Sequence, residues 1–136
     1  VHLGSMSDSI QTVIFDNPDA CEGDAFVLNS PYRGGTHLPD VTVVTPVFVA
    51  GKPAYWLGSR GHHADIGGRT PGSLPPDSRH IDEEGVLIDN FKVVDRGIIQ
   101  EDERLIMTKQ NQDSVTRVKL SAMSSIDAYF KACTGQ

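Results

Sequence analysis

A run of β-branched residues from Val41 to Val49 constrains the fold of this chain more than any other feature. Such residues favour extended backbone, and the turn formers Gly51-Lys52-Pro53 separate the run from a second apolar stretch, Ala54 to Gly58. The pattern predicts a β-hairpin. Because Pro46 has no N–H to donate to a neighbouring strand, we expect a bulge or a sheet edge at that position.

Short elements on both sides of this hairpin predict an α+β fold. Ser7-Asp8 and the apolar residues after them indicate a short N-terminal helix, which Pro18 limits. Apolar runs bounded by turn formers predict further strands, and the segment from Ser114 to Ala132 has the composition of a C-terminal helix. The predicted strands are Ala25 to Leu28, Gly85 to Ile88 and Phe91 to Val94. We therefore expect short strands and hairpins, long Gly/Pro-rich loops and two helices, as a fragment of a larger domain.

Length and charge bound what the chain can do. Its 136 residues suffice for one modest core, so residues 1–136 are one domain or part of one. The formal charge is -6 and the 12 Lys and Arg residues are scattered, which argues against nucleic-acid binding. No apolar run approaches the roughly 20 residues of a membrane span, and the first residues lack a secretory signal. We expect a cytoplasmic protein that does not bind membranes.

Two clusters of histidine and aspartate flank the predicted hairpin. The first contains His37 and Asp40, in a turn where Gly34 and Gly35 permit backbone angles closed to other residues. A neutral imidazole and a carboxylate are normal ligands of Zn²⁺ or Mn²⁺. The same residues also suit a capping Asp and a hydrogen-bonded His on a loop, so this cluster alone does not select metal binding.

The second cluster contains His62, His63 and Asp65, at the start of a long glycine- and proline-rich loop. Side chains alternate along an extended segment, so His62 and His63 face opposite ways and at most one of them can join His37 and Asp40. The alternative is a polar loop whose histidines bond to backbone carbonyls. A hairpin brings its outer ends together, which favours the metal interpretation.

Other conspicuous residues have simpler interpretations. Arg60 and Arg33 can bind a carboxylate or phosphate oxygen, although a structural or solvated arginine is the favoured interpretation. Trp56 lies on the apolar strand and is predicted to be part of the core. His2 and His80 show no partner pattern, so we leave both out of the candidate site.

Three segments of the chain read NSPYRGGTHLPDVTVVTPVF, SRGHHADIGGRTPGSLPPDS and EEGVLIDNFKVVDRG. In order and spacing they resemble the hydantoinase B family, which includes the second half of 5-oxoprolinase. VHLGSMSDSI also resembles a stretch that the family carries upstream. The resemblance extends from about Val1 to Gly97, and residues 98–136 are expected to be a divergent tail.

The resemblance implies ATP-dependent opening of a cyclic amide such as 5-oxoproline or a hydantoin. In that family a hydantoinase A-like partner binds ATP and phosphorylates the lactam oxygen, and the B region supplies a metal and the water that attacks the activated carbon. The resemblance implies that His37, Asp40 and His62 bind Zn or Mn, with a further Asp ligand upstream of Val1. It also implies that ATP binds to the partner and not to this chain.

His63, Asp65 and Arg60 are the candidate catalytic residues beside this implied metal site. His63 and Asp65 would orient a ligand or relay a proton, and Arg60 would contact a carboxylate or phosphate oxygen. Ser30 occupies a position where many relatives have Asp, which leaves the substrate open.

Three functional hypotheses follow from these residues. The leading one is a fragment of a cyclic amide hydrolase that contributes metal ligands, is inactive alone and belongs to an oligomeric full-length protein. The second is a non-catalytic truncated remnant of such an enzyme. The third is a small metal-binding module without catalysis.

Overall fold

The computed structural model describes residues 2–100. They fall into two compact units, of which the first contains residues 2–64 and 87–100 and the second contains residues 65–86. The helix predicted from Ser114 to Ala132 lies outside the described residues. Within residues 2–100, the helices are too short or too polar to cross a membrane.

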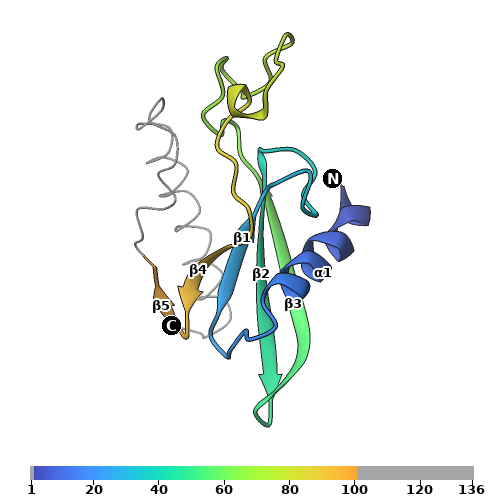
Figure 1. Cartoon of the computed structure of the whole chain (residues 1–136), viewed down its shortest axis with the longest axis vertical. Helices are drawn as coiled ribbons and strands as arrows, with labels where there is room; N and C mark the ends of the chain where they lie inside the picture. The colour runs from blue at the N-terminus through green and yellow to red at the C-terminus, as the bar shows by residue number, and fades with distance from the viewer. Residues whose placement is uncertain (1, 101–136) are drawn as a thin grey trace. The chain divides into compact units, whose positions relative to one another are not determined.

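An antiparallel sheet of five strands in the order β3-β2-β1-β4-β5 forms the first unit (Figure 1). The strands are β1 (Ala25–Leu28), β2 (Asp40–Val49), β3 (Lys52–His62), β4 (Phe91–Asp95) and β5 (Ile98–Ile99). Together with one N-terminal helix, this sheet confirms the predicted α+β class. The runs predicted as strands at residues 25–28 and 91–94 correspond to β1 and β4.

The predicted hairpin is formed by β2 and β3, and it is longer than the sequence indicated. Its loop is Ala50 and Gly51, whose φ angles of 52° and 76° are the positive values that a tight two-residue hairpin turn requires. Lys52 and Pro53, expected in the turn, therefore belong to β3. The irregularity expected near Pro46 occurs just after it, where the β2–β3 register shifts between residues 47 and 48.

The helix α1 (Met6–Asp16) follows a short 3-10 turn, η1 (Leu3–Ser5), and contacts β2 and β3 on one face of the sheet (Figure 1). It ends before Pro18, as predicted. A Cβ added to Gly58 would lie 2.6 Å from Met6 Sδ, so this glycine permits the close approach of the helix to β3. The core between helix and sheet contains Val13, Phe26, Leu28 and Val44, with Ile10, Ala20 and Trp56 packed against it.

The strand predicted from Gly85 to Ile88 is wrong, because residues 85–89 form no strand. The Ile88 amide donates to the side-chain oxygen of Asn29 at 2.6 Å. The Ile88 carbonyl accepts from the amides of Asn29 and Ser30 at 3.0 and 3.3 Å. The Ile88 amide is thus bound by a side-chain carbonyl instead of a neighbouring strand, and the apolar run does not join the sheet.

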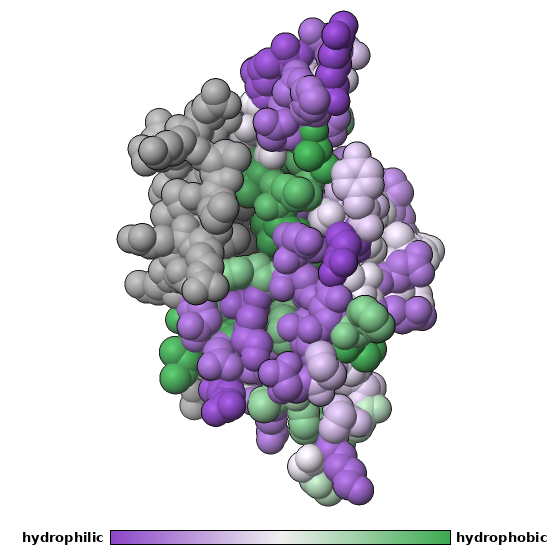
Figure 2. All heavy atoms as spheres, viewed as in Figure 1, coloured by the Kyte–Doolittle hydropathy of each residue, from purple (hydrophilic) through white to green (hydrophobic). Residues whose placement is uncertain are grey.

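The described part of the second unit is a loop with one 3-10 turn, η2 (Ile81–Glu83). On the face shown in Figure 2 its spheres are mostly purple, so this face is largely hydrophilic. The Asp65 carboxylate organises the loop by accepting from the amides of Gly67 and Gly72 at 2.7 and 3.2 Å and from Ser73 Oγ at 2.9 Å. The lack of longer elements agrees with the density of glycine and proline in this segment.

Candidate metal centre

The turn that carries His37 and Asp40 is anchored to the end of β1. Asn29 Nδ2 donates to the Leu38 carbonyl at 2.9 Å, and the Leu38 side chain is buried. The Asp40 amide donates to the His37 carbonyl at 3.0 Å. These contacts fix both functional side chains relative to the sheet.

Gly35 is required for this turn to lie against β1. Its amide donates to the Ser30 carbonyl at 2.8 Å. A Cβ added to Gly35 would lie 2.5 Å from the Ser30 carbonyl oxygen and 2.6 Å from that of Asn29. Because both neighbours are backbone atoms, they cannot move aside without displacing the strand end.

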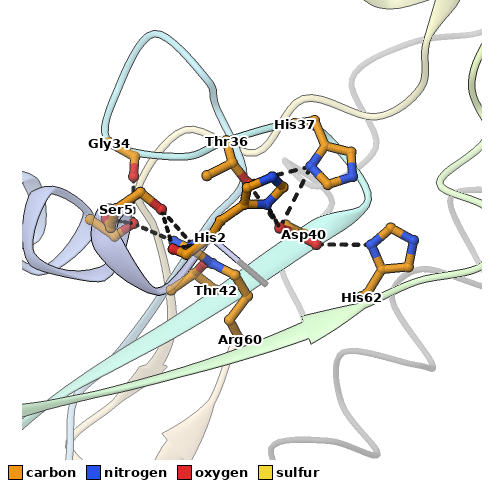
Figure 3. A network of polar contacts seen from close by, with 10 residues as sticks. His2, Ser5, Gly34, Thr36, His37, Asp40, Thr42, Arg60 and His62 are labelled. Atoms are coloured by element: carbon orange, nitrogen blue, oxygen red, sulfur yellow. Dashed lines mark hydrogen bonds and ion pairs between the residues drawn. The ribbon is translucent and has the colours of Figure 1, made fainter.

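The strand register brings His62 to Asp40. Asp40 is the first residue of β2 and is paired with His62, the last residue of β3. Directly opposite residues of an antiparallel pair project on the same face of the sheet. His62 Nδ1 lies 2.8 Å from Asp40 Oδ1, and the rings of His62 and His37 have their centroids 5.3 Å apart (Figure 3). His37, Asp40 and His62, the ligands expected from the sequence, therefore lie beside one another, with His37 Nδ1 3.5 Å from Asp40 Oδ2.

His2, for which the sequence showed no partner pattern, also contacts Asp40 and His37. Its Nδ1 lies 2.8 Å from Asp40 Oδ2, and its ring meets that of His37 edge to face at 5.3 Å (Figure 3). The two residues His2 and Asp40 are 38 positions apart, and no local spacing connects them. The VHLGSM stretch resembles the family, but nothing in it marks this histidine as a partner of Asp40.

Asp40 is a buried anion surrounded by more exposed imidazoles. Its side chain is 4% exposed, whereas those of His2, His37 and His62 are 44%, 30% and 62% exposed. Burial alone would raise the pKa of the Asp40 carboxyl. Hydrogen bonds from His2, His62 and Thr36, with the nearby His37, outweigh burial and hold that pKa well below its ordinary value. The centre therefore contains a carboxylate that stays ionised.

An open cavity of about 400 Å³ borders the cluster. Its walls include His2, Asp40 and His62, and also Met6 and Arg60. Small-molecule sites typically have volumes of roughly 300–1,000 Å³. The cavity can accommodate a small organic molecule next to the carboxylate and the imidazoles.

The expected supporting residues occupy different positions. The His63 amide donates to the Pro39 carbonyl at 2.8 Å, next to the Asp40 turn. Burial, followed by the neighbouring His62, lowers the pKa of His63. Asp65 belongs to the second unit, where its carboxylate accepts the three hydrogen bonds described above.

Arg60 makes hydrogen bonds to the protein with all three nitrogens of its guanidinium. Nε donates to Thr42 Oγ1 at 2.7 Å, and Nη2 donates to Ser9 Oγ at 2.7 Å. Nη1 donates to Ser5 Oγ at 2.6 Å and to the His2 carbonyl at 3.1 Å (Figure 3). Arg33 forms ion pairs with Asp16 and Asp89.

The donor set of the cluster fits a divalent transition metal. One ligand atom each from His2, His37 and Asp40 lies within 4.8 Å of the others. A cation with bonds of about 2.0–2.2 Å holds two ligand atoms at most about 4.4 Å apart. Imidazole and carboxylate donors at this spacing suit Zn²⁺ or a similar ion, and small side-chain adjustments would bring them within bonding range.

Comparisons with known proteins identify the family of the chain. A family model described as hydantoinase B/oxoprolinase matches residues 1–135, well beyond Gly97, where the resemblance was expected to end. The protein 5-oxoprolinase 1 from Arabidopsis thaliana is 46% identical over 121 residues, covering 87% of this chain and 10% of that protein. The 5-oxoprolinase of Saccharomyces cerevisiae is 49% identical over 105 residues, covering 75% of this chain and 8% of that protein.

A solved structure shows the same fold. The ATP-dependent caprolactamase from Pseudomonas jessenii has a TM-score of 0.71 and 30% identity, covering 91% of this chain and 22% of that chain. The chain spans only about a tenth of the length of the two 5-oxoprolinases. From the family-model match and these relatives, the chain belongs to the hydantoinase B/oxoprolinase family.

Proposed function

We propose that this chain forms the metal-binding part of an ATP-dependent hydrolase of cyclic amides, such as 5-oxoproline or a hydantoin. The observation that carries the proposal is the buried carboxylate of Asp40, which lies among three imidazoles at the edge of an open cavity. Relatives named 5-oxoprolinase and ATP-dependent caprolactamase support a lactam as the substrate class.

His37, Asp40 and His62 are the proposed metal ligands, with Zn²⁺ or Mn²⁺ as the ion. A bound divalent cation would supply Lewis acidity and make water a better nucleophile near neutral pH. Asp40 contributes a permanent negative charge, because its pKa is held low. His37 and His62 contribute nitrogen donors from two different turns, so the site forms only when the β2–β3 hairpin is paired.

The cavity beside the cluster is the proposed site of the lactam ring. Its walls combine the polar cluster with Met6, whose thioether provides apolar contact for the methylene groups of a ring. We assign His63 and Asp65 to orienting a ligand or relaying a proton.

The remaining parts of the reaction are assigned to partners of this chain. A hydantoinase A-like subunit or domain would bind ATP and activate the lactam oxygen, and the full-length protein would be an oligomer in the cytoplasm. The chain would be part of a single hydantoinase B-type domain and would be inactive alone. The small share of the relatives' length that it spans supports this division of labour.

Equilibrium dialysis of the full chain with Zn²⁺ and with Mn²⁺ tests the metal site. We expect one ion per chain, and His37→Ala and His62→Ala should each weaken binding at least about tenfold, on the scale of changes at metal sites. His80→Ala is the matched control, because His80 is an exposed histidine of the second unit. Equal binding by the unmutated chain and both cluster variants would exclude these ligands.

Activity in the presence of a hydantoinase A-like partner tests the reaction. We expect 5-oxoproline or a hydantoin to stimulate phosphate release from ATP, and His37→Ala to abolish that stimulation. Tight metal binding without any lactam-dependent phosphate release would instead favour a metal-binding module or a non-catalytic remnant. The two measurements therefore separate the ion site from the chemistry.

A further inference from the structure

The turn that carries His2 has an unusual backbone conformation. His2 has a φ of 53°, in the left-handed region that non-glycine residues rarely adopt. Its carbonyl accepts three hydrogen bonds, from the Ser5 amide at 3.1 Å, from Ser5 Oγ at 2.8 Å and from Arg60 Nη1 at 3.1 Å. Such a conformation persists where the surroundings fix it, and here they fix the imidazole against Asp40.

Arg60 connects this turn to the sheet. Its guanidinium reaches Thr42 on β2 and Ser5 in η1 (Figure 3). It also donates to Ser9 in α1. Ser9 is fully buried, and its hydroxyl also donates to the Gly34 carbonyl in the turn that precedes His37. One side chain of β3 therefore ties together the segments that carry His2 and His37.

The acceptors around Arg60 are all uncharged oxygens of the protein. Each of its three nitrogens has at least one such partner at 2.6–3.1 Å. A guanidinium bound in this way holds a fixed position, and its planar fork suits simultaneous contacts that a lysine ammonium cannot reproduce. This arrangement favours a positioning role over a direct contact with substrate.

We propose that His2 is an additional ligand of the metal centre and that Arg60 is the positioning residue that holds it there. The proposal rests on the proposed function, in which Asp40 and His37 bind a divalent cation. With His2 included, the donors that this chain contributes are three imidazoles and one carboxylate. Imidazole-rich sites favour Zn²⁺, whereas oxygen donors suit Mn²⁺, so His2 would shift the preference of the centre toward Zn²⁺.

Metal titration of the full chain with His2→Gln tests the ligand role. We expect Zn²⁺ affinity, measured by competition with a chelator, to fall about 10- to 100-fold, and Mn²⁺ affinity to fall clearly less. The absorption bands of bound Co²⁺, which respond to the number and type of its ligands, should change in position and intensity. His80→Gln is the control and should match the unmutated chain in all three readouts.

Arg60→Lys tests the positioning role through a double-mutant cycle. Alone it should lower Zn²⁺ affinity about tenfold, and combined with His2→Gln it should add almost nothing, because both changes remove the same interaction. Arg33→Lys is the control for replacing a guanidinium by an ammonium elsewhere in the first unit, because Arg33 pairs with Asp16 and Asp89. Additive losses for Arg60→Lys and His2→Gln would overturn the positioning role.

The outcomes distinguish this proposal from the proposed function. If His37→Ala loses Zn²⁺ while His2→Gln binds it as the unmutated chain does, the ligand role of His2 is overturned and the metal centre remains. If the unmutated chain binds neither ion, the metal centre itself is refuted. Thermal unfolding of each variant accompanies the titrations. His2→Gln alters a side chain that is 44% exposed, so it tests the ligand role even if Arg60→Lys does not fold.

Discussion

Asp24 and Asp40 are both buried carboxylates of the first unit, but they differ in the groups that surround them. Asp24 accepts from the amides of Cys21 and Arg96 at 2.9 and 2.8 Å and from Lys92 Nζ at 3.0 Å. Two of these partners are backbone amides, which cannot replace the hydrogen bond to Asp24 with a bond to a metal ion. Asp24 therefore joins the segment before β1 to β4 and to the turn after it.

The described hydrogen bonds to the Asp40 carboxylate all come from side chains, namely two imidazoles and one hydroxyl. His2, His62 and Thr36 supply these contacts, at 2.8, 2.8 and 3.0 Å. Imidazoles can exchange a hydrogen bond for a bond to a cation, which a backbone amide cannot do. The comparison teaches that burial alone does not identify a functional carboxylate; the kind of partner does.

The largest expected effect is on folding, at Asp24. Asp24→Ala removes the buried partner of Lys92 and the acceptor of two backbone amides, which should lower the free energy of unfolding by about 3–5 kcal/mol. Urea titration followed by circular dichroism measures this change. Asp19→Ala, at an exposed aspartate nearby, should stay within about 0.5 kcal/mol. A similarly small change for Asp24→Ala would remove the proposed distinction between the two carboxylates.

The next effect is on metal binding, at Asp40. Asp40→Asn removes the negative charge but keeps one acceptor, so we expect Zn²⁺ affinity to fall at least about 100-fold, which is about 2.7 kcal/mol. The free energy of unfolding should change by only about 1 kcal/mol. Asp24→Asn is the opposite control and should leave the affinity of the folded chain within about threefold. Isothermal titration calorimetry measures the Zn²⁺ affinity of both variants. A larger loss of affinity in Asp24→Asn than in Asp40→Asn would contradict the prediction.

A smaller effect is expected where backbone geometry supports the centre. Gly35→Ala places a methyl group against the backbone of Asn29 and Ser30, which should cost about 1–3 kcal/mol of stability and weaken Zn²⁺ binding. Gly61 is the matched control, because a Cβ there meets no atom within 4 Å. Gly61→Ala should change stability by at most about 0.5 kcal/mol. Equal effects at both glycines would show that the turn does not depend on this close contact.

The smallest effect is the pH dependence of stability that Asp24 contributes, which a comparison with Asp24→Asn isolates. Burial raises the pKa of Asp24, but its amide and Lys92 partners outweigh burial and lower it below the ordinary value. A lowered folded-state pKa stabilises the protein above the unfolded value of about 3.9, and this contribution is lost as pH falls through the folded pKa. The stability difference between the unmutated chain and Asp24→Asn should therefore be constant above about pH 5 and shrink below about pH 4. Urea unfolding curves of both proteins at several pH values across this range measure the difference. A stability difference that stays constant below about pH 4 would contradict the lowered pKa of Asp24.

Local sequence patterns predicted the sheet better than they predicted the site. The β-branched run and the glycine after it specified the β2–β3 hairpin, since both act over a few residues. The segment from Gly85 to Ile88 has the same apolar character, but it does not join the sheet. The Ile88 amide donates to the Asn29 side chain instead of to a neighbouring strand. That outcome depends on a residue about 60 positions away, which no local pattern encodes.

The same reason explains the uneven result at the candidate site. His37 and Asp40 lie in one turn, and pairing of the hairpin strands places His62 opposite Asp40. The proximity of these three residues could therefore be predicted from the sequence. His2 reaches Asp40 through long-range packing, in which α1 contacts β3 and Arg60 donates to Ser5 of η1. A structural or solvated Arg60 was the favoured interpretation, but its partners in the N-terminal turn depend on that packing and could not be predicted from local sequence.

The pairing of Asp40 with His62 has a consequence for the dynamics of the sheet. These residues form the last rung of the ladder between β2 and the edge strand β3, where strand ends normally fray. An ion bound by both side chains would hold the ends of β2 and β3 together at this residue pair. Occupancy of the centre and protection of the neighbouring amides from hydrogen exchange would then rise and fall together.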